Sequence, residues 1–360
     1  MRTLDISWNL YKKYGQTEEI RDYYGLLAIY GLGQTVYEAG DAKWNNYYIS
    51  ILDKYPDSVE HPHYNFECYR AGGNAKAWSM MMGQVELDRE LLQRYADRTM
   101  EGGREKDGIL CMPGMESQGA VWIDVAAAVT PFMVFAGLAL QEQRYIDFGA
   151  EQCFKLYEAL LDEECGLLHQ CRGFLEDTCL CSQDHWSRGN GWGYMALAEL
   201  VKYLPEDSPH RPKAELYYRE LSRSVLRYQT DKGLWRQEMT EPLSWEESSG
   251  TALFLYGLGG GIRLGLLEGD EYREAFCNGI RGLIDYGINE DFSTELSCPG
   301  CLCPGEGELK GTKQAYMTEK SPVHNEHHSF GAFMLALVEA HRNTIREADW
   351  KKEWKTEGMR

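Results

Sequence analysis

The stretch Gly191-Trp-Gly-Tyr-Met-Ala-Leu-Ala198 is apolar on almost every side of the helix that it predicts, and five similar stretches occur along the chain. These are residues 23–30, 73–81, 123–129, 250–258 and 330–337. Helices that are apolar nearly all round are buried. The glycines and alanines in these stretches permit close contact between helices, so we expect six helices packed around a common axis.

Charged stretches lie between the apolar ones, as in Glu86 to Met100, Arg144 to Leu161 and Pro212 to Tyr228. Helices with one charged face cover buried ones. Six inner and six outer helices make an (α/α)6 barrel, and the alternating β-branched runs that predict a sheet are scarce. We therefore predict an all-α protein in which residues 1–360 form a single barrel domain, because no linker divides the chain.

Two connections are long, Asp162 to Ser187 and Asn289 to Asn325, and both carry His and Cys residues. Loops longer than about 12 to 15 residues are usually functional or disordered. We expect these two to gather at the mouth of the barrel and to contribute to a site.

The overall composition excludes several classes of partner. A formal net charge of −19 disfavours nucleic acid, which is bound through many Lys and Arg contacts. The most apolar run, Val125 to Leu140, is interrupted by Thr130 and Pro131 and is too short to span a membrane. The first residues lack the pattern of a secretory signal, and the 11 cysteines are best interpreted as reduced thiols. We expect a cytoplasmic protein that binds neither nucleic acid nor membrane.

Asp124 begins an apolar run, and its position supports two interpretations. Its carboxylate could cap the following helix by accepting hydrogen bonds from free backbone N–H groups. Alternatively, Trp122, Pro131 and Phe132 surround it with apolar bulk, which raises the pKa of a carboxyl group toward the range that a general acid needs. Position alone favours the cap.

The segment Asp184-His-Trp-Ser-Arg-Gly-Asn-Gly-Trp192 combines two indoles, a guanidinium and two glycines where a helix begins. Arg188 could pair with a surface carboxylate, and Asn190 could cap the helix. However, Arg is suited to bidentate recognition of a carboxylate, and glycines let the backbone approach a ligand. The 23 Tyr, 10 Trp and 11 Phe residues offer flat faces on which sugars stack as well as rings for the core. The segment therefore indicates a binding site.

Other polar residues have less specific patterns. His169 would by default be a buried, hydrogen-bonded histidine, and Glu246 and Glu247 are either a second catalytic carboxylate or first-turn charges of a helix. The residues with metal-ligand side chains are Cys298, Cys301, Cys303, His324, His327 and His328, with Cys179 and Cys181 as further candidates. They could supply zinc ligands, but no second Cys-x2-Cys pair is present, so we expect no metal.

Several motifs together resemble the unsaturated glucuronyl and rhamnogalacturonyl hydrolases, glycoside hydrolase families 88 and 105, with the closer likeness to family 105. The motifs are Trp122-Ile-Asp124 with Pro131-Phe132, Gly166-Leu-Leu-His169, Trp186-Ser-Arg-Gly-Asn-Gly-Trp192, Gly233-Leu-Trp-Arg-Gln237 and Glu247-Ser-Ser-Gly-Thr-Ala252. The resemblance covers most of the chain and implies an (α/α)6 barrel. It also implies cofactor-free removal of a terminal 4,5-unsaturated uronic acid from an oligosaccharide made by a polysaccharide lyase.

The resemblance also assigns roles to residues. Asp124 would protonate C4 of the double bond and then help to deprotonate the attacking water, after which the hemiketal opens and releases the neighbouring sugar. The residues implied to hold the unsaturated ring and its carboxylate are Trp122, His169, Trp186, Arg188 and Trp192. A strongly acidic protein needs a local cation such as Arg188 to retain an anionic sugar.

The chain departs from the family at two positions. The second inner helix usually begins with an Asp, but Tyr69-Arg-Ala-Gly-Gly-Asn74 stands there, and a histidine before the Trp-x-Asp motif is replaced by Ile109-Leu-Cys-Met-Pro113. Two alternatives therefore stay open. One is a two-carboxylate glycosidase that acts on a saturated sugar, with Glu246 or Glu247 as the partner of Asp124. The other is a non-catalytic sugar-binding barrel.

Overall fold

The computed structural model describes residues 1–17, 22–52, 66–301 and 307–348. Helices of two kinds alternate along these residues. The inner helices are α2 (Tyr23–Ala39), α4 (Gly73–Met81), α6 (Asp124–Leu140), α8 (Ser187–Tyr203), α10 (Ser248–Arg263) and α13 (His327–Arg342). The outer helices are α1 (Thr3–Thr17), α3 (Ala42–Leu52), α5 (Arg89–Met100), α7 (Gln143–Leu160), α9 (Arg211–Leu226) and α11 (Asp270–Gly282).

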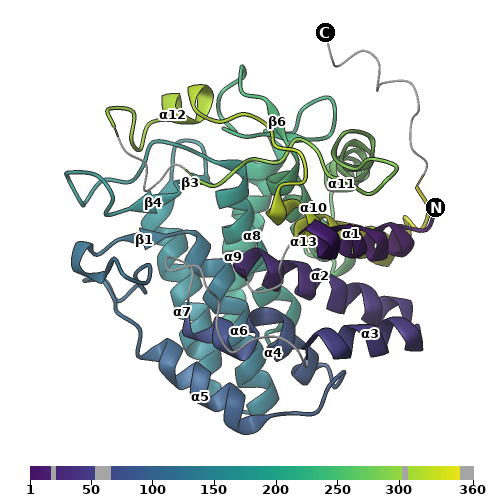
Figure 1. Ribbon diagram of the computed structural model, residues 1–360. Helices are drawn as coiled ribbons and strands as arrows, with labels where there is room; N and C mark the ends of the chain where they lie inside the picture. Colours follow the sequence, from purple (N-terminus) through teal and green to yellow (C-terminus); the bar gives the residue numbers. More distant parts are fainter. Residues whose placement is uncertain (18–21, 53–65, 302–306, 349–360) are drawn as a thin grey trace.

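The inner helices form a closed ring. Each contacts the next in chain order, and α13 contacts α2 (Figure 1). All six apolar stretches lie in or overlap an inner helix, and the predicted all-α (α/α)6 barrel is confirmed. The extension of one domain over residues 1–360 stays a prediction.

The contact between α13 and α2 explains one glycine of the ring. A Cβ atom on Gly331 would lie 2.6 Å from the backbone carbon of Leu27 and 2.7 Å from the backbone nitrogen of Ala28. Real Cβ atoms do not approach other atoms so closely, so only glycine permits this spacing. The outer helices differ from the inner ones in that each keeps a polar face, as the charges of α11 show.

Short antiparallel ladders connect the helices, although the sequence predicts no sheet. The strand pairs are β1 (Val121–Trp122) with β4 (Cys171–Arg172), β2 (Leu161–Asp162) with β3 (Leu167–Leu168), and β5 (Trp235–Arg236) with β6 (Glu246–Glu247). Each strand has two residues, too few to show an alternating pattern in the sequence. The remaining elements are the short helices Glu67–Ala71, Glu116–Gln118, Leu283–Gly287 and α12 (Lys313–Thr318).

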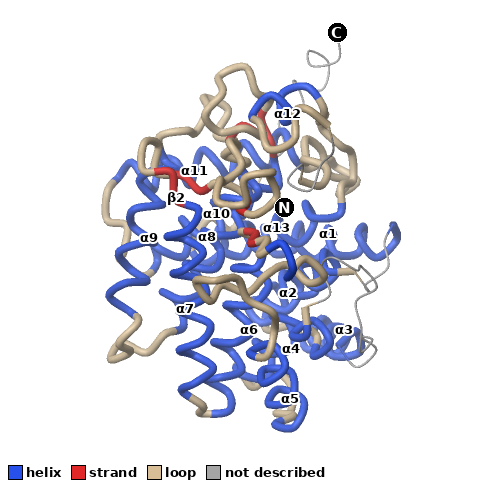
Figure 2. The backbone as a smooth tube through the Cα atoms, turned by 90° about the vertical axis from the view of Figure 1, so that its left-hand side faces the viewer, coloured by secondary structure: helices blue, strands red, loops and turns tan. Residues whose placement is uncertain are grey.

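The two long connections meet beside the N-terminal ends of the inner helices, as predicted. The backbone N–H of Gln183 donates to the carbonyl of Gly311 at 2.7 Å, and the Tyr316 hydroxyl donates to the side chain of Gln170. Figure 1 shows this loop-rich end at the top, and Figure 2 shows the strands there. The opposite end of the barrel has short connections.

Two further observations concern the described residues alone. None of their helices combines the length and the apolar character that crossing a membrane requires. Their ten cysteines form no disulfide, and Cys303 lies outside the described residues.

Candidate functional site

A pocket opens between the N-terminal halves of α2, α4, α6 and α8. Its walls are largely aromatic. The aromatic lining residues are Tyr23, Tyr24, Tyr30, Tyr69 and Trp192. Two polar side chains, Asn74 and Asp124, reach into this apolar lining, so the pocket has the character of a ligand site with few polar groups.

Asp124 is the first residue of α6, and the preceding cap position belongs to Ile123. The carboxylate is 8% exposed and is the only carboxylate among the described residues that line the pocket. It lies in the first turn, where the partial positive charge of the helix N-terminus favours an anion. The expected rise of its pKa stays a prediction.

Asn74 lies in the first turn of α4, at the position where the resemblance implies an Asp. Its side-chain Nδ2 donates to the carbonyl of Ala127 on α6 at 2.9 Å, while its Oδ1 is buried without a hydrogen-bond partner. A buried acceptor that lacks a donor is costly unless a ligand or water supplies one. Asn74 therefore offers an acceptor to whatever occupies the pocket.

A chain of hydrogen bonds ends at Tyr23 in the pocket wall. Glu326 Oε1 lies 2.6 Å from His328 Nδ1, and His328 Nε2 lies 2.7 Å from the Tyr23 hydroxyl. Burial alone would raise the pKa of Glu326, but His328 and Arg188 lower it to about 2. Burial and Arg188 lower the pKa of His328, so the imidazole is neutral.

These ionisation states fix the direction of the chain. Because Glu326 is ionised, it accepts the Nδ1 proton of His328, and Nε2 is left to accept the proton of Tyr23. Burial raises the pKa of Tyr23 well above its ordinary value, so the hydroxyl keeps this proton. The oxygen of Tyr23 can then accept a hydrogen bond from a ligand. Sequence analysis missed this chain, because His328 and Tyr23 are 305 positions apart.

Arg188, at the start of α8, is fully buried and turned toward the loop that follows α11. It donates to the carbonyls of Cys298 and Pro299 and to the Ser249 hydroxyl, and it forms an ion pair with Glu326 at 3.4 Å. Its guanidinium also stacks on the Trp186 ring at 4.7 Å. Arg188 does not line the pocket among the described residues. Its predicted role in binding a carboxylate stays a prediction.

The predicted tryptophans fall into two groups. Trp192 lines the pocket with Asp124. Trp122 in β1 packs against Phe174 with ring centres 5.6 Å apart, and Trp186 donates from Nε1 to the Cys298 sulfur at 3.2 Å. Both are buried in the loop layer, which we define as the connections beside the N-terminal ends of the inner helices, rather than in the pocket wall. Asn190 does not act as a cap but binds both backbone groups of Leu168, which fixes β3 to α8.

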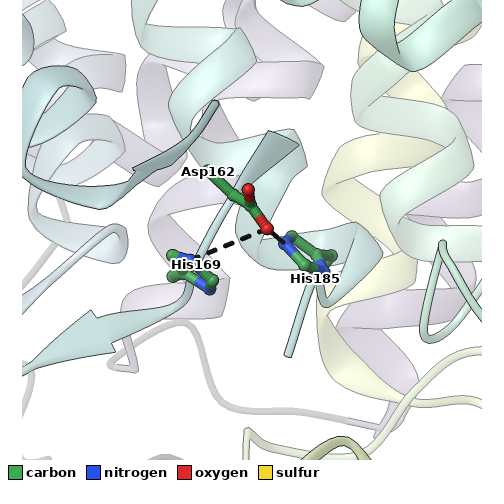
Figure 3. A group of neighbouring side chains, drawn as sticks. All are labelled: Asp162, His169 and His185. Carbon is green, nitrogen blue, oxygen red and sulfur yellow. Dashed lines mark hydrogen bonds and ion pairs between the residues drawn. The ribbon is translucent and has the colours of Figure 1, made fainter. Parts of the chain in front are cut away.

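His169 does not line the pocket either but lies next to Asp162 and His185 (Figure 3). His185 Nε2 lies 2.9 Å from Asp162 Oδ2, and His169 Nε2 lies 3.9 Å from the same oxygen. Burial lowers the pKa of His185, but the neighbouring Cys165 and Glu238 more than offset it and raise the value to about 10. Burial and His185 lower the pKa of His169, which is therefore a neutral imidazole beside a charged one.

Neither candidate for a second catalytic carboxylate lines the pocket. Glu247 caps α10, accepting from the backbone N–H groups of Ser249 and Gly250, and Glu246 pairs with Lys232 at 3.4 Å. This arrangement matches the first-turn interpretation and gives Asp124 no carboxylate partner among the described lining residues.

The described cysteines and histidines between residues 298 and 328 do not come together as a zinc site. Cys298 is buried and accepts from Trp186 and Gln237, while His324 pairs with Glu295 and His327 stacks on Tyr24. Cys303 lies outside the described residues. The described side chains that do bring metal-ligand atoms within 4.8 Å of one another are Asp162, His169 and His185.

Comparison with known proteins agrees with the fold. The family model described as Glycosyl Hydrolase Family 88 matches residues 9–344. The chain is 27% identical over 173 residues to an unsaturated 3S-rhamnoglycuronyl hydrolase of Formosa agariphila, a match that covers 46% of each protein. A second hydrolase of the same name, from Alteromonas, is matched over 34% of its length. These matches thus span less than half of the relatives.

Solved structures match over nearly the whole chain. A glycoside hydrolase of family 105 from C. acetobutylicum has a TM-score of 0.78 at 19% identity, covering 95% of this chain and 100% of that one. The unsaturated glucuronyl hydrolase of Bacillus sp. GL1 has a TM-score of 0.68 at 16% identity, covering 95% and 96%. At these identities the likeness establishes the shared barrel fold.

Proposed function

The chain belongs to glycosyl hydrolase family 88, and on this premise we propose that it removes a terminal 4,5-unsaturated uronic acid from oligosaccharides produced by a polysaccharide lyase. The observation that carries the proposal is Asp124, the one carboxylate among the described residues that line an aromatic pocket. The names of the relatives support the substrate class, since two are unsaturated rhamnoglycuronyl hydrolases and one is an unsaturated rhamnogalacturonyl hydrolase of Bacillus subtilis.

The proposed reaction begins as hydration of an enol ether. Asp124 in its acid form transfers a proton to C4 of the double bond, and positive charge develops at C5 and on the ring oxygen. The resulting carboxylate then accepts a proton from the water that attacks C5. The hemiketal opens, the bond to the neighbouring sugar breaks, and the two sugars separate. A single carboxylate acts first as acid and then as base, so no second carboxylate is required.

Other residues of the pocket can bind the sugar around Asp124. The face of Trp192 offers a stacking surface for the sugar ring, and Tyr23 and Asn74 offer acceptors for its hydroxyl groups. Arg188 lies behind Tyr23, whose pKa it lowers against the larger effect of burial. Its positive charge favours an anionic sugar even where the two do not touch. Trp122 and Trp186 pack among the loops beside the N-terminal ends of the helices that carry these groups.

The decisive experiment follows the loss of ultraviolet absorbance of unsaturated disaccharides from several lyases. Asp124→Asn keeps the shape of the side chain and removes the acid, so we expect the rate to fall by about 1000-fold. Asp231→Asn, a change at an exposed Asp, is the matched control and should keep wild-type activity. Equal rates for Asp124→Asn and wild type would exclude the mechanism. Cleavage of saturated sugars alone would instead support a conventional glycosidase.

A further inference from the structure

A second cluster of functional side chains lies outside the pocket, in the connection between α7 and α8. Asp162, His169 and His185 come from the beginning, the middle and the end of this connection. Figure 3 shows the Asp162 carboxylate between the two imidazole rings. The side chains of Asp162 and His169 are about one-fifth exposed, so the cluster is reached from solvent.

An ordinary ion pair explains only part of this cluster. Elsewhere in the chain His210 pairs with Asp147 at 2.7 Å, and that pair contains one imidazole. Here a second imidazole faces the same carboxylate oxygen at 3.9 Å, beyond hydrogen-bond distance, and the buried Nδ1 of His169 has no hydrogen-bond partner. The carboxylate of Asp162 thus faces two imidazoles, and only that of His185 lies within hydrogen-bond distance of it.

Two imidazoles and a carboxylate are a common ligand set for zinc. Ligand atoms about 2.0 to 2.1 Å from a tetrahedral ion lie roughly 3.3 Å from one another. The separations of 2.9 Å and 3.9 Å from Asp162 Oδ2 to the two imidazole nitrogens bracket this value.

The surroundings supply a supporting contact. Glu238 Oε1 lies 3.7 Å from Nδ1 of His185, and the same carboxylate accepts the His185 backbone N–H at 2.7 Å. A carboxylate behind a metal-bound imidazole is the usual supporting arrangement.

We propose that Asp162, His169 and His185 bind a zinc ion. The ion would join the two ends of the connection that leads into Trp186 and Arg188, and it would therefore hold this connection beside the pocket. The corresponding sequence pattern is Asp-x6-His-x15-His, which has the ligand types of a zinc site in an unfamiliar order. The sequence pattern had instead suggested zinc ligands among Cys298, Cys301 and Cys303 and the histidines that follow them.

The test uses untagged protein, stripped with a chelator and titrated with Co²⁺ as a spectroscopic probe and with Zn²⁺ as competitor. We expect one Co²⁺ per chain, the absorption of a four-coordinate ion, and displacement by Zn²⁺. His169→Ala should weaken Co²⁺ binding by more than about 100-fold, since even the loss of a supporting contact costs 10- to 100-fold. His210→Ala, which removes the imidazole of a simple ion pair, is the matched control and should bind as wild type.

A second readout separates ligand loss from misfolding. Zn²⁺ should raise the melting temperature of wild type and of His210→Ala but not of His169→Ala, whose metal-free melting temperature should match wild type. Absence of stoichiometric binding, or wild-type affinity in His169→Ala, would overturn the site. None of these readouts depends on the proposed hydrolase activity.

Discussion

At the C-terminal ends of the inner helices buried charges are paired with one another, whereas at the N-terminal ends polar groups surround a pocket. Glu339 of α13 is fully buried and lies within 3.3 Å of Lys202, Arg263 and Arg342. Burial alone would raise its pKa, but Lys202 and the two arginines lower it to about 2. At the other end, Asp124 and Asn74 face the cavity.

The difference indicates separate tasks for the two ends. A buried ion cluster holds the ring of helices together, although such clusters are costly to assemble. A pocket whose buried Asn74 acceptor lacks a donor is instead prepared for a ligand. We call the C-terminal ends of the inner helices the closed end and their N-terminal ends the open end. Changes at the closed end should therefore affect stability first, and changes at the open end should affect activity first.

The largest effect should follow from Glu339→Gln, which leaves three cations around a neutral side chain. We expect the free energy of unfolding to fall by about 3 to 5 kcal/mol, the usual result of breaking a buried ion pair. Chemical denaturation measures this, with Glu90→Gln as control because Glu90 pairs with Arg94 on the surface. If both variants lose less than about 1 kcal/mol, the closed end does not stabilise the barrel.

The same carboxylate should make the protein sensitive to acid. Its pKa is lowered from 4.5 to about 2, so its contribution is complete above about pH 4.5 and is lost as the pH falls through 2. One proton changes stability by about 1.4 kcal/mol per pH unit, so about 3 kcal/mol should disappear over this range. Unfolding measured from pH 5 to 2 should show a steeper loss for wild type than for Glu339→Gln. Parallel curves would contradict the assignment.

At the open end, Tyr23→Phe removes the hydroxyl that His328 orients and leaves the aromatic wall in place. A hydrogen bond between neutral groups is worth about 0.5 to 1.5 kcal/mol, so we expect kcat/KM on the unsaturated disaccharide to fall about 2- to 10-fold. The melting temperature should change little. Tyr37→Phe, at an exposed tyrosine, is the matched control and should keep wild-type kcat/KM. An unaltered kcat/KM in Tyr23→Phe would remove Tyr23 from the site.

The smallest effect concerns Asn74→Asp, which adds a second carboxylate to the pocket of Asp124. A like charge disfavours ionisation, so the pKa of Asp124 should rise. The alkaline limb of the pH–rate profile should therefore move to higher pH by about one pH unit. Asn74→Ala removes the amide without adding charge and should leave the limb in place. The same shift in both variants would show that charge is not its cause.

The inner helices were within reach of sequence reasoning because local pattern encodes them, whereas the position of Asp124 alone favours a cap and its role as an acid is implied by the family resemblance. The apolar stretch around Gly191 predicts a buried helix wherever the partner helices lie, and Asp124 and Trp192 were both expected in the site. Trp122 and Trp186 belong to motifs of the family resemblance, yet they pack in the loop layer. A motif records which residues are needed but not whether they touch a ligand or support those that do.

What sequence reasoning missed depends on contacts between distant segments. Glu326 caps α13 and His328 follows it closely, but their relation to Tyr23 exists only because the last inner helix closes the ring against the first. The zinc ligands likewise meet because β2 and β3 fold the connection back on itself. Neither arrangement leaves a periodic signal along the chain.

The hydroxyl of Tyr30, on the lining of the pocket, donates to Glu199 at 3.0 Å, and Glu199 lies fully buried near Lys202 of the ion cluster. The lining of the pocket is thus joined by hydrogen bonds to the charged cluster at the C-terminal ends of the inner helices. In the proposed reaction a sugar chain would insert one terminus into the pocket, as an enzyme that trims single terminal units requires. The released monosaccharide would then leave after the rest of the chain has withdrawn.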